Sequence, residues 1–160
     1  MTEAELHERA LAYLARYATT RQGLTRALDR KAGVEGRAAV RAVVARLAER
    51  GLVDDAAFAR VRAGRLVREG RSRVAVAAHL AARGVDAATA REVLPEDDFG
   101  AALVLTRKRR IGAFRAAGAD EGRELGVLAR AGFSQAVAVR VLAMGREDAE
   151  EAIGRLREGG

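Results

Sequence analysis

The chain contains no cysteine, no tryptophan and no asparagine, and its single proline is Pro95. Without cysteine it can form neither a disulfide framework nor a thiolate metal site. No apolar run approaches the roughly 18 residues that a membrane-spanning helix needs, and the first residues lack the basic-then-apolar layout of a signal peptide. We therefore expect a cytoplasmic protein that makes no contact with a membrane.

Aromatic residues are also scarce, at 4% of the 160 residues, whereas hydrophobic residues as a whole reach 49% and alanine is frequent among them. Strong helix formers dominate, and prolines, which interrupt helices, are almost absent. The composition therefore predicts an all-α protein. By length the chain is one domain, or a short array of units that share a core.

Three segments share one pattern, in which a helix ends in a basic turn and is followed by a glycine and then an apolar residue. The glycines are Gly33, Gly84 and Gly132, which lie 51 and then 48 residues apart. Glycine ends a helix at this place because the chain turns into the left-handed region, and basic side chains suit the negative end of the helix dipole. Such regular spacing predicts a repeated unit of about 50 residues and a positive φ at each glycine. The leucines expected to be buried at equivalent positions before them are Leu28, Leu80 and Leu128.

Apolar periodicity and capping residues predict three helices in each unit. In the first unit they cover about 3–16, the segment from a Thr19–Thr20 cap to Gly33, and about 35–50. In the second and third units the start signals are Asp54–Asp55, Ser72, Asp86, Asp97–Asp98, Asp120 and Ser134, with stops at Gly70, Gly84, Leu94 and Gly132.

The units are predicted to span residues 1–51, 52–95 and 96–160, and the last includes a charged tail from Gly145 that either extends as a further helix or frays. A three-helix unit this small cannot bury all its apolar surface alone, so neighbouring units complete the core by stacking. The predicted fold is all-α, with three tandem three-helix repeats stacked into an elongated, curved single domain.

The formal net charge is +7, and the excess lies toward the N-terminus. Residues 1–51 carry 10 basic and 6 acidic groups, 52–94 carry 8 and 5, and 95–160 carry 11 of each. Lys31 and Lys108 are the only lysines, a bias that a GC-rich genome explains, although it does not explain the uneven distribution. A basic surface of this kind suits a nucleic acid or an acidic protein partner.

The densest basic segment has six arginines within 14 residues and one acid, Glu69. On a helix, Arg62 and Arg65 lie near the side of Phe58 whereas Arg60 and Arg68 point elsewhere, so the cluster forms a collar rather than a stripe. It is either a solvated surface or a binding surface. The arginines are Arg60, Arg62, Arg65, Arg68, Arg71 and Arg73.

Nothing in the sequence builds an enzyme. His7 and His79 lie in different units with no motif around either, and the glycine at position 70 lacks the spacing of a phosphate-binding loop. The pairs Asp54–Asp55 and Asp97–Asp98 sit at helix starts, where capping is a commoner role than metal binding. Aromatic residues are too few and scattered for base stacking. We expect no catalytic residue, no cofactor and no metal.

The junction Leu52-Val53-Asp54-Asp55-x-x-Phe58-Ala59-Arg60 carries the most specific resemblance to a known family. It is similar to the Leu–acid–acid–x–x–aromatic–Ala–Arg junction that joins the first two repeats of RecX proteins. Three other stretches resemble that family, in its first repeat, its second-repeat hairpin and, by pattern only, its third repeat. They are Ala10-Leu11-x-Tyr13-Leu14-x-Arg16 with Thr20 to Gly33, Arg68-x-Gly70 through Val76 and Leu80 to Arg83-Gly84-Val85, and Arg107-Lys108-Arg109.

The resemblance implies a monomeric regulator that binds filaments of the RecA recombinase on DNA. It implies that the protein mainly inhibits ATP hydrolysis, strand exchange and coprotease activity, within recombination, DNA repair and the SOS response. Regulators of this family are thought to lie in the helical groove of the RecA–DNA filament, where protein carboxylates and DNA phosphates are within reach. Arginine suits that groove because its planar guanidinium group binds carboxylate or phosphate through two parallel hydrogen bonds. The candidate contact residues are Arg60, Arg62, Arg65, Arg68, Arg71, Arg73, Arg83, Arg107, Lys108 and Arg109.

Two other functions stay open on the sequence. One is a helical protein that binds single- or double-stranded DNA without sequence preference and affects recombination indirectly. The other is a helical-repeat scaffold with no dedicated partner. Salt separates the first from a filament regulator, because binding dominated by phosphates falls steeply with ionic strength.

Overall fold

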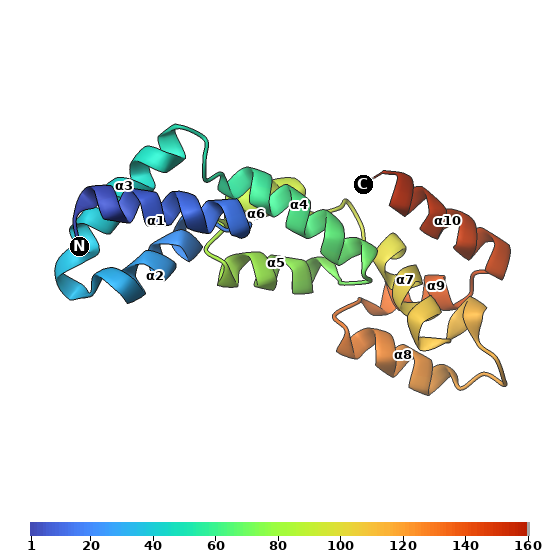
Figure 1. Cartoon of the computed structure of the whole chain (residues 1–160). Helices are drawn as coiled ribbons and strands as arrows, with labels where there is room; N and C mark the ends of the chain where they lie inside the picture. The colour runs from blue at the N-terminus through green and yellow to red at the C-terminus, as the bar shows by residue number, and fades with distance from the viewer. Residues whose placement is uncertain (160) are drawn as a thin grey trace. The chain divides into compact units, whose positions relative to one another are not determined.

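The computed structural model describes residues 1–159, which form ten α-helices and two short 3-10 helices with no strand (Figure 1). The prediction of an all-α fold is confirmed. None of these helices is long and apolar enough to cross a membrane. The helices are α1 (Glu3–Arg16), α2 (Arg21–Ala32), η1 (Val34–Gly36), α3 (Arg37–Glu49), α4 (Asp55–Arg68), α5 (Arg73–Ala82), α6 (Ala87–Val93), α7 (Phe99–Arg109), η2 (Gly112–Phe114), α8 (Glu121–Arg130), α9 (Gln135–Leu142) and α10 (Arg146–Glu158).

The nine predicted helices correspond to α1–α9, and the charged tail forms a tenth. Helix α10 forms because Ala149 and Ile153, one turn apart, are both buried in a segment that is otherwise charged. The helix predicted from about residue 35 instead begins with the short η1 and becomes α-helical at Arg37.

The chain divides into two compact units, which are described separately. Unit 1 comprises residues 1–60 with 80–90, and unit 2 comprises residues 61–79 with 91 onward. Each unit therefore takes part of α4 and part of α5. The division into three repeats stays a proposal.

The core of unit 1 lies among α1, α2 and α3. Each helix contributes apolar side chains at helical spacing, such as Leu6 and Ala10 from α1. A capping box of Thr2 and Glu5 starts α1, and its hydrogen bonds to Thr2 hold the pKa of Glu5 below its usual value. The buried core residues are Leu6, Ala10, Leu24, Leu28, Val40, Val43, Val44, Leu47 and Val53.

Unit 2 is built around α7, which is buried on most of its circumference and contacts α9 and α10. Glu124 of α8 is buried and is held by Arg115, with an Nε–Oε1 distance of 2.9 Å, and by the backbone N–H of Gly112 in η2. These hydrogen bonds, that from Arg115 foremost, hold the pKa of Glu124 below its usual value against the opposing effect of burial. Glu124 therefore stays ionised inside the unit.

The three glycines that suggested a repeat all have positive φ, as predicted: 68° at Gly33, 87° at Gly84 and 92° at Gly132. At the last two, the next residue donates its N–H to a leucine carbonyl five positions earlier, Val85 to Leu80 and Phe133 to Leu128. This is the Schellman arrangement. Gly33 differs, because its own N–H bonds to Asp29 and its ψ is −175°, which leads directly into η1.

The paired carboxylates cap helices, but not only their own. Asp54 accepts the N–H of Ala57 at the start of α4, as predicted. Its neighbour Asp55 instead accepts the N–H of Arg21 at the start of α2, with a distance of 2.8 Å. A helix start exposes four unpaired N–H groups, so a nearby carboxylate from another helix can serve as well as a local one.

The second pair repeats this arrangement in unit 2. Asp97 accepts the N–H of Phe99 at the start of α7, while the side chain of Asp98 accepts no N–H from its own helix. It accepts the N–H of Arg73 at the start of α5, again at 2.8 Å. The expectation that Asp55 and Asp98 cap their own helices was therefore wrong, and the two contacts tie α2 to α4 and α5 to α7.

Candidate partner-binding site

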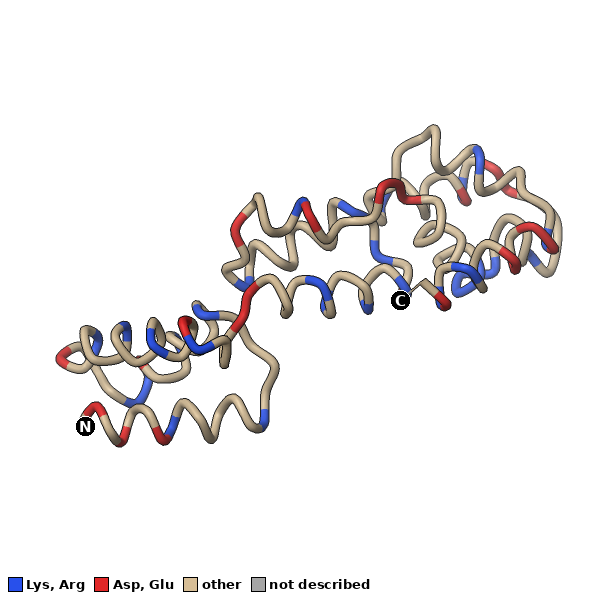
Figure 2. The backbone as a smooth tube through the Cα atoms, turned by 90° about the horizontal axis from the view of Figure 1, so that it is seen from above, with Lys and Arg blue, Asp and Glu red and all other residues tan. Residues whose placement is uncertain are grey.

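The predicted contact residues are divided between the two units. Arg60 and Arg83 belong to unit 1, and the other eight belong to unit 2. Glu69 is the only acidic residue between Asp55 and Asp86. The charged residues of this stretch are therefore almost all basic, and they are coloured blue in Figure 2. The side chains nevertheless differ in what they contact, and these contacts decide which of them remain available to a partner.

Two arginines of α4 bind within unit 2. Arg62 lies 2.9 Å through Nη1 from Nε2 of His79 on α5, and both side chains are half-buried. Arg65 forms an exposed ion pair with Glu69 one turn later, with a distance of 3.7 Å. Arg62 therefore links two helices, whereas an exposed pair such as Arg65–Glu69 contributes little and leaves Arg65 free to change partner. His79 is thus engaged with Arg62 at the edge of the unit rather than with any site.

Arg68 is half-buried, although we expected it to be exposed. Its guanidinium lies back along α4 beside Gly64, which has no side chain to prevent this approach. It also lines a hollow of about 250 Å³ together with Pro95 and Leu156. The sequence could not show that a later segment of the chain lies beside Arg68.

The structure brings the basic run of α7 to the end of α4. The ammonium group of Lys108 donates a 2.6 Å hydrogen bond to the backbone carbonyl of Glu69. Gly70 lies directly against α7, since a Cβ there would be 3.2 Å from the backbone nitrogen of Leu105. Arg71, the residue after Gly70, therefore lies near the 107–109 run. Nothing in the sequence indicated that these two segments meet. Lys108 has a structural role at the carbonyl end of α4.

Five exposed arginines of the candidate set keep their guanidinium groups free of hydrogen bonds and ion pairs within residues 1–159. An unpaired guanidinium on the surface can bind a carboxylate or a phosphate without first breaking an internal contact. Arg107 also lacks such a bond but is half-buried. One of the five is Arg73, whose backbone N–H, but not its side chain, is bonded to Asp98. The others are Arg60, Arg71, Arg83 and Arg109.

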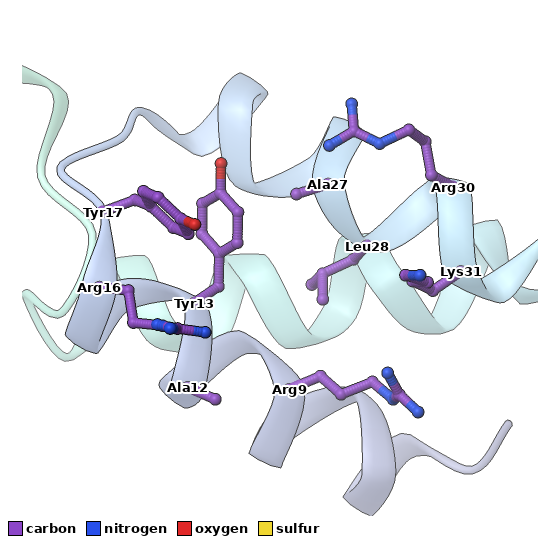
Figure 3. A pocket seen from close by; sticks show the side chains of 9 residues that line it. All are labelled: Arg9, Ala12, Tyr13, Arg16, Tyr17, Ala27, Leu28, Arg30 and Lys31. Atoms are coloured by element: carbon purple, nitrogen blue, oxygen red, sulfur yellow. The ribbon is translucent and has the colours of Figure 1, made fainter.

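A second basic feature, in unit 1, was missed by the sequence analysis. A hollow of about 300 Å³ between α1 and α2 is lined by Tyr13, Tyr17 and four basic side chains (Figure 3). The two tyrosine rings pack together with their centroids 4.9 Å apart. The spacing of Tyr13 and Tyr17 indicated this pair, because residues four apart share a helix face. The small total number of aromatic residues had argued against a stacking site.

The described part of the chain, residues 1–159, contains no cluster of three or more His, Cys, Asp or Glu side chains placed to hold a metal ion. The candidate partner-binding site consists of the exposed basic side chains described above, which lie on or next to helices. Such an arrangement recognises anionic groups by hydrogen bonds and charge.

Comparison with known protein families and curated sequences agrees with the features above. Residues 54–94 match the family model described as the second three-helix domain of RecX. The chain is 37% identical over 158 residues to the regulatory protein RecX of Myxococcus xanthus, covering 86% of this chain and 83% of that protein. The chain belongs to the RecX family.

Other proteins named RecX are also similar to this chain. The regulatory protein RecX of Agrobacterium fabrum is 37% identical over 103 residues, which cover 62% of this chain and 56% of that protein. A crystal structure of a regulatory protein RecX superposes with a TM-score of 0.70 at 23% identity, covering 87% of this chain and 70% of the other. That structure supports the fold, and the curated relatives are named as regulatory proteins rather than enzymes.

Proposed function

We propose that this RecX protein binds RecA–DNA filaments and inhibits RecA-dependent ATP hydrolysis, strand exchange and coprotease activity. Membership of the RecX family supports the partner. The observation that carries the proposed contact is the set of exposed guanidinium groups with no internal partner, above all Arg60 and Arg71. We further propose that it acts as a cytoplasmic monomer, with no catalytic residues of its own, in recombination, DNA repair and the SOS response.

The three-repeat organisation is part of this proposal. Residues 1–51, 52–95 and 96–160 are the proposed repeats, and the RecX model that matches 54–94 supports the middle one. The helix-to-helix contacts support it too, because Asp55 and Asp98 each bind the start of a helix in the preceding repeat through a 2.8 Å hydrogen bond.

The internal contacts divide the candidate residues by role. Arg62 and Lys108 bind His79 and the carbonyl of Glu69, so their removal disturbs the fold. We assign the partner contact to the exposed arginines whose side chains make no internal hydrogen bond or ion pair. These are Arg60, Arg71, Arg73, Arg83 and Arg109. Because each guanidinium can make two parallel bonds, carboxylates of a protein partner suit them as well as phosphates do.

Co-sedimentation tests the partner directly. Purified chain is mixed with RecA filaments on single-stranded DNA, with the same DNA alone and with RecA alone, at low and at physiological salt. Sedimentation with the filament at physiological salt, above that with bare DNA, supports the proposal. Equal binding to bare DNA that falls by about 1,000-fold or more with added salt would favour the alternative of a sequence-independent DNA-binding protein.

A further inference from the structure

Two hollows of unit 1 form a second basic surface and share Tyr13 and Arg30. The first, of about 300 Å³, lies between α1 and α2 (Figure 3). The second, of about 270 Å³, is lined by the end of α1, the start of α2 and the end of α5. The basic side chains that line one hollow or both are Arg9, Arg16, Arg26, Arg30, Lys31 and Arg83.

The charge in these hollows is of one sign. No acidic side chain lines either of them, and none of the six cations makes a hydrogen bond or ion pair within residues 1–159. Another hollow of the same unit differs, because there Glu3 and Glu8 accompany two arginines and Glu3 is paired with Arg46. The lining of the two hollows is therefore basic without acidic side chains, which suits a polyanion.

The tyrosines add a feature that charge alone does not supply. Tyr13 is half-buried and packs against the core of unit 1, and the ring of Tyr17 lies against it at an interplanar angle of 43°. Tyr17 is 54% exposed. Its ring is therefore supported by Tyr13 and open to solvent elsewhere, with Arg16 close to it on α1 and Arg30 across the hollow on α2 (Figure 3).

We propose that this surface binds single-stranded nucleic acid, with a base stacked on Tyr17 and the backbone phosphates on the surrounding cations. A flat ring beside unpaired cations is the combination that single-strand-binding proteins use. A duplex keeps its bases stacked on one another, so only an unpaired strand can offer a base to the ring. An acidic peptide could use the cations but would leave the tyrosine pair without a role.

The proposal goes beyond binding to the recombinase filament and requires no recombinase. It assigns Tyr17 to stacking, Tyr13 to holding the Tyr17 ring, and Arg16, Arg30 and Lys31 to phosphates. Sequence preference is not expected, because every base has a face that can stack.

The first test measures the affinity of the full chain for a fluorescein-labelled dT15 oligonucleotide by anisotropy. Tyr17→Ala should weaken binding by about tenfold, whereas Tyr17→Phe should preserve it, because a stacked base contacts the ring rather than the hydroxyl. The affinity falls with salt, and the slope of log K against log salt concentration measures how many cations contact phosphates. The double variant Arg30→Gln, Lys31→Gln should reduce the magnitude of this slope by about 0.7 for each cation removed. The matched control is Arg37→Gln, Arg41→Gln on exposed positions of α3, which should keep most of the affinity.

The second test uses the emission of the two tyrosines, the only ones in a chain that has no tryptophan. Unlabelled dT15 should quench this emission, and a 15-base-pair duplex or polyglutamate of equal charge should not. Binding of polyglutamate as tight as that of dT15, or an unchanged dT15 affinity in Tyr17→Ala, would overturn the proposal. Either result would leave co-sedimentation with RecA filaments unaffected, so this site and the filament contact can fail separately.

Discussion

The hydroxyl group of Thr20, at the start of α2, donates a 2.5 Å hydrogen bond to the backbone carbonyl of Arg83, at the end of α5. The same oxygen accepts the N–H of Gly23 and so caps α2. An equivalent approach occurs in unit 2, where a Cβ on Gly132, after α8, would lie 2.7 Å from the hydroxyl oxygen of Ser72, which caps α5. In both units the end of one helix therefore meets the start of an earlier one.

Replacing Thr20 should destabilise the protein through both of its hydrogen bonds. Thr20→Val keeps the shape but leaves the N–H of Gly23 and the carbonyl of Arg83 without this partner, at a cost of about 2 kcal/mol in the free energy of unfolding. Urea denaturation followed by circular dichroism measures the loss. Thr20→Ser, which retains the hydroxyl, should cost less than half as much, and equal losses in the two variants would contradict this role.

Leu80 and Leu128, which precede the Schellman glycines, are completely buried. Changing either to alanine should lower the free energy of unfolding by about 2–5 kcal/mol, the usual cost of a cavity at a buried leucine. Val74 is 68% exposed on α5, the helix that carries Leu80, so Val74→Ala is the control and should have little effect. Thermal melts that show no difference between Leu80→Ala and Val74→Ala would contradict the packing.

Gly33 and Gly84 allow backbone strain to be separated from crowding. Both have positive φ, but a Cβ on Gly33 would meet nothing within 4 Å, whereas one on Gly84 would lie 2.5 Å from the Cβ of Gln22. Gly33→Ala should therefore cost only strain, about 1–3 kcal/mol. Gly84→Ala should cost more because α2 must also shift. Denaturant unfolding of the two variants measures the difference, and the opposite order would contradict the close approach of α5 to α2.

The ion pair of Arg115 with the buried Glu124 should make stability depend on pH. Folding lowers the pKa of Glu124, so the unfolded chain binds the proton more readily at this carboxyl. Its contribution is present above the ordinary glutamate pKa of about 4.3 and is lost as the pH falls through the lower value of the folded state. Urea unfolding at pH 7, 4 and 3 should show a smaller acid loss in Glu124→Gln than in the wild type. Glu121→Gln, exposed on the same helix, should behave as the wild type does.

Local features of the fold were predictable because they depend on neighbouring residues. The start of α1 at Glu3, the caps at Thr20 and Ser72 and the positive φ of the three glycines follow from short-range chemistry. The roles of Asp55 and Asp98 did not follow, since a carboxylate can cap any helix start that packs within reach. That choice is made by tertiary contact.

For the candidate site, the sequence predicted which residues are basic but not which of them make internal contacts. The arginine-rich segment was visible, but the sequence could not show that Arg62 contacts His79 or that Lys108 reaches the carbonyl of Glu69 across 39 positions. The tyrosine pair was accessible to sequence reasoning, because Tyr13 and Tyr17 lie one helical turn apart. What could not be foreseen was that no acid would line the surface around them.

Inhibition of RecA-dependent ATP hydrolysis by charge-reversed variants tests the central claim most directly. Arg60→Glu, Arg71→Glu changes two exposed arginines without internal partners, and Arg41→Glu, Arg91→Glu changes the net charge equally at exposed positions outside the candidate site. Like charges facing a partner cost several kcal/mol, so the first variant should need about tenfold more protein, or more, for half-maximal inhibition, with helicity unchanged. The second should inhibit as the wild type does. Equal inhibition by both variants, or none by the wild-type chain, would contradict the account.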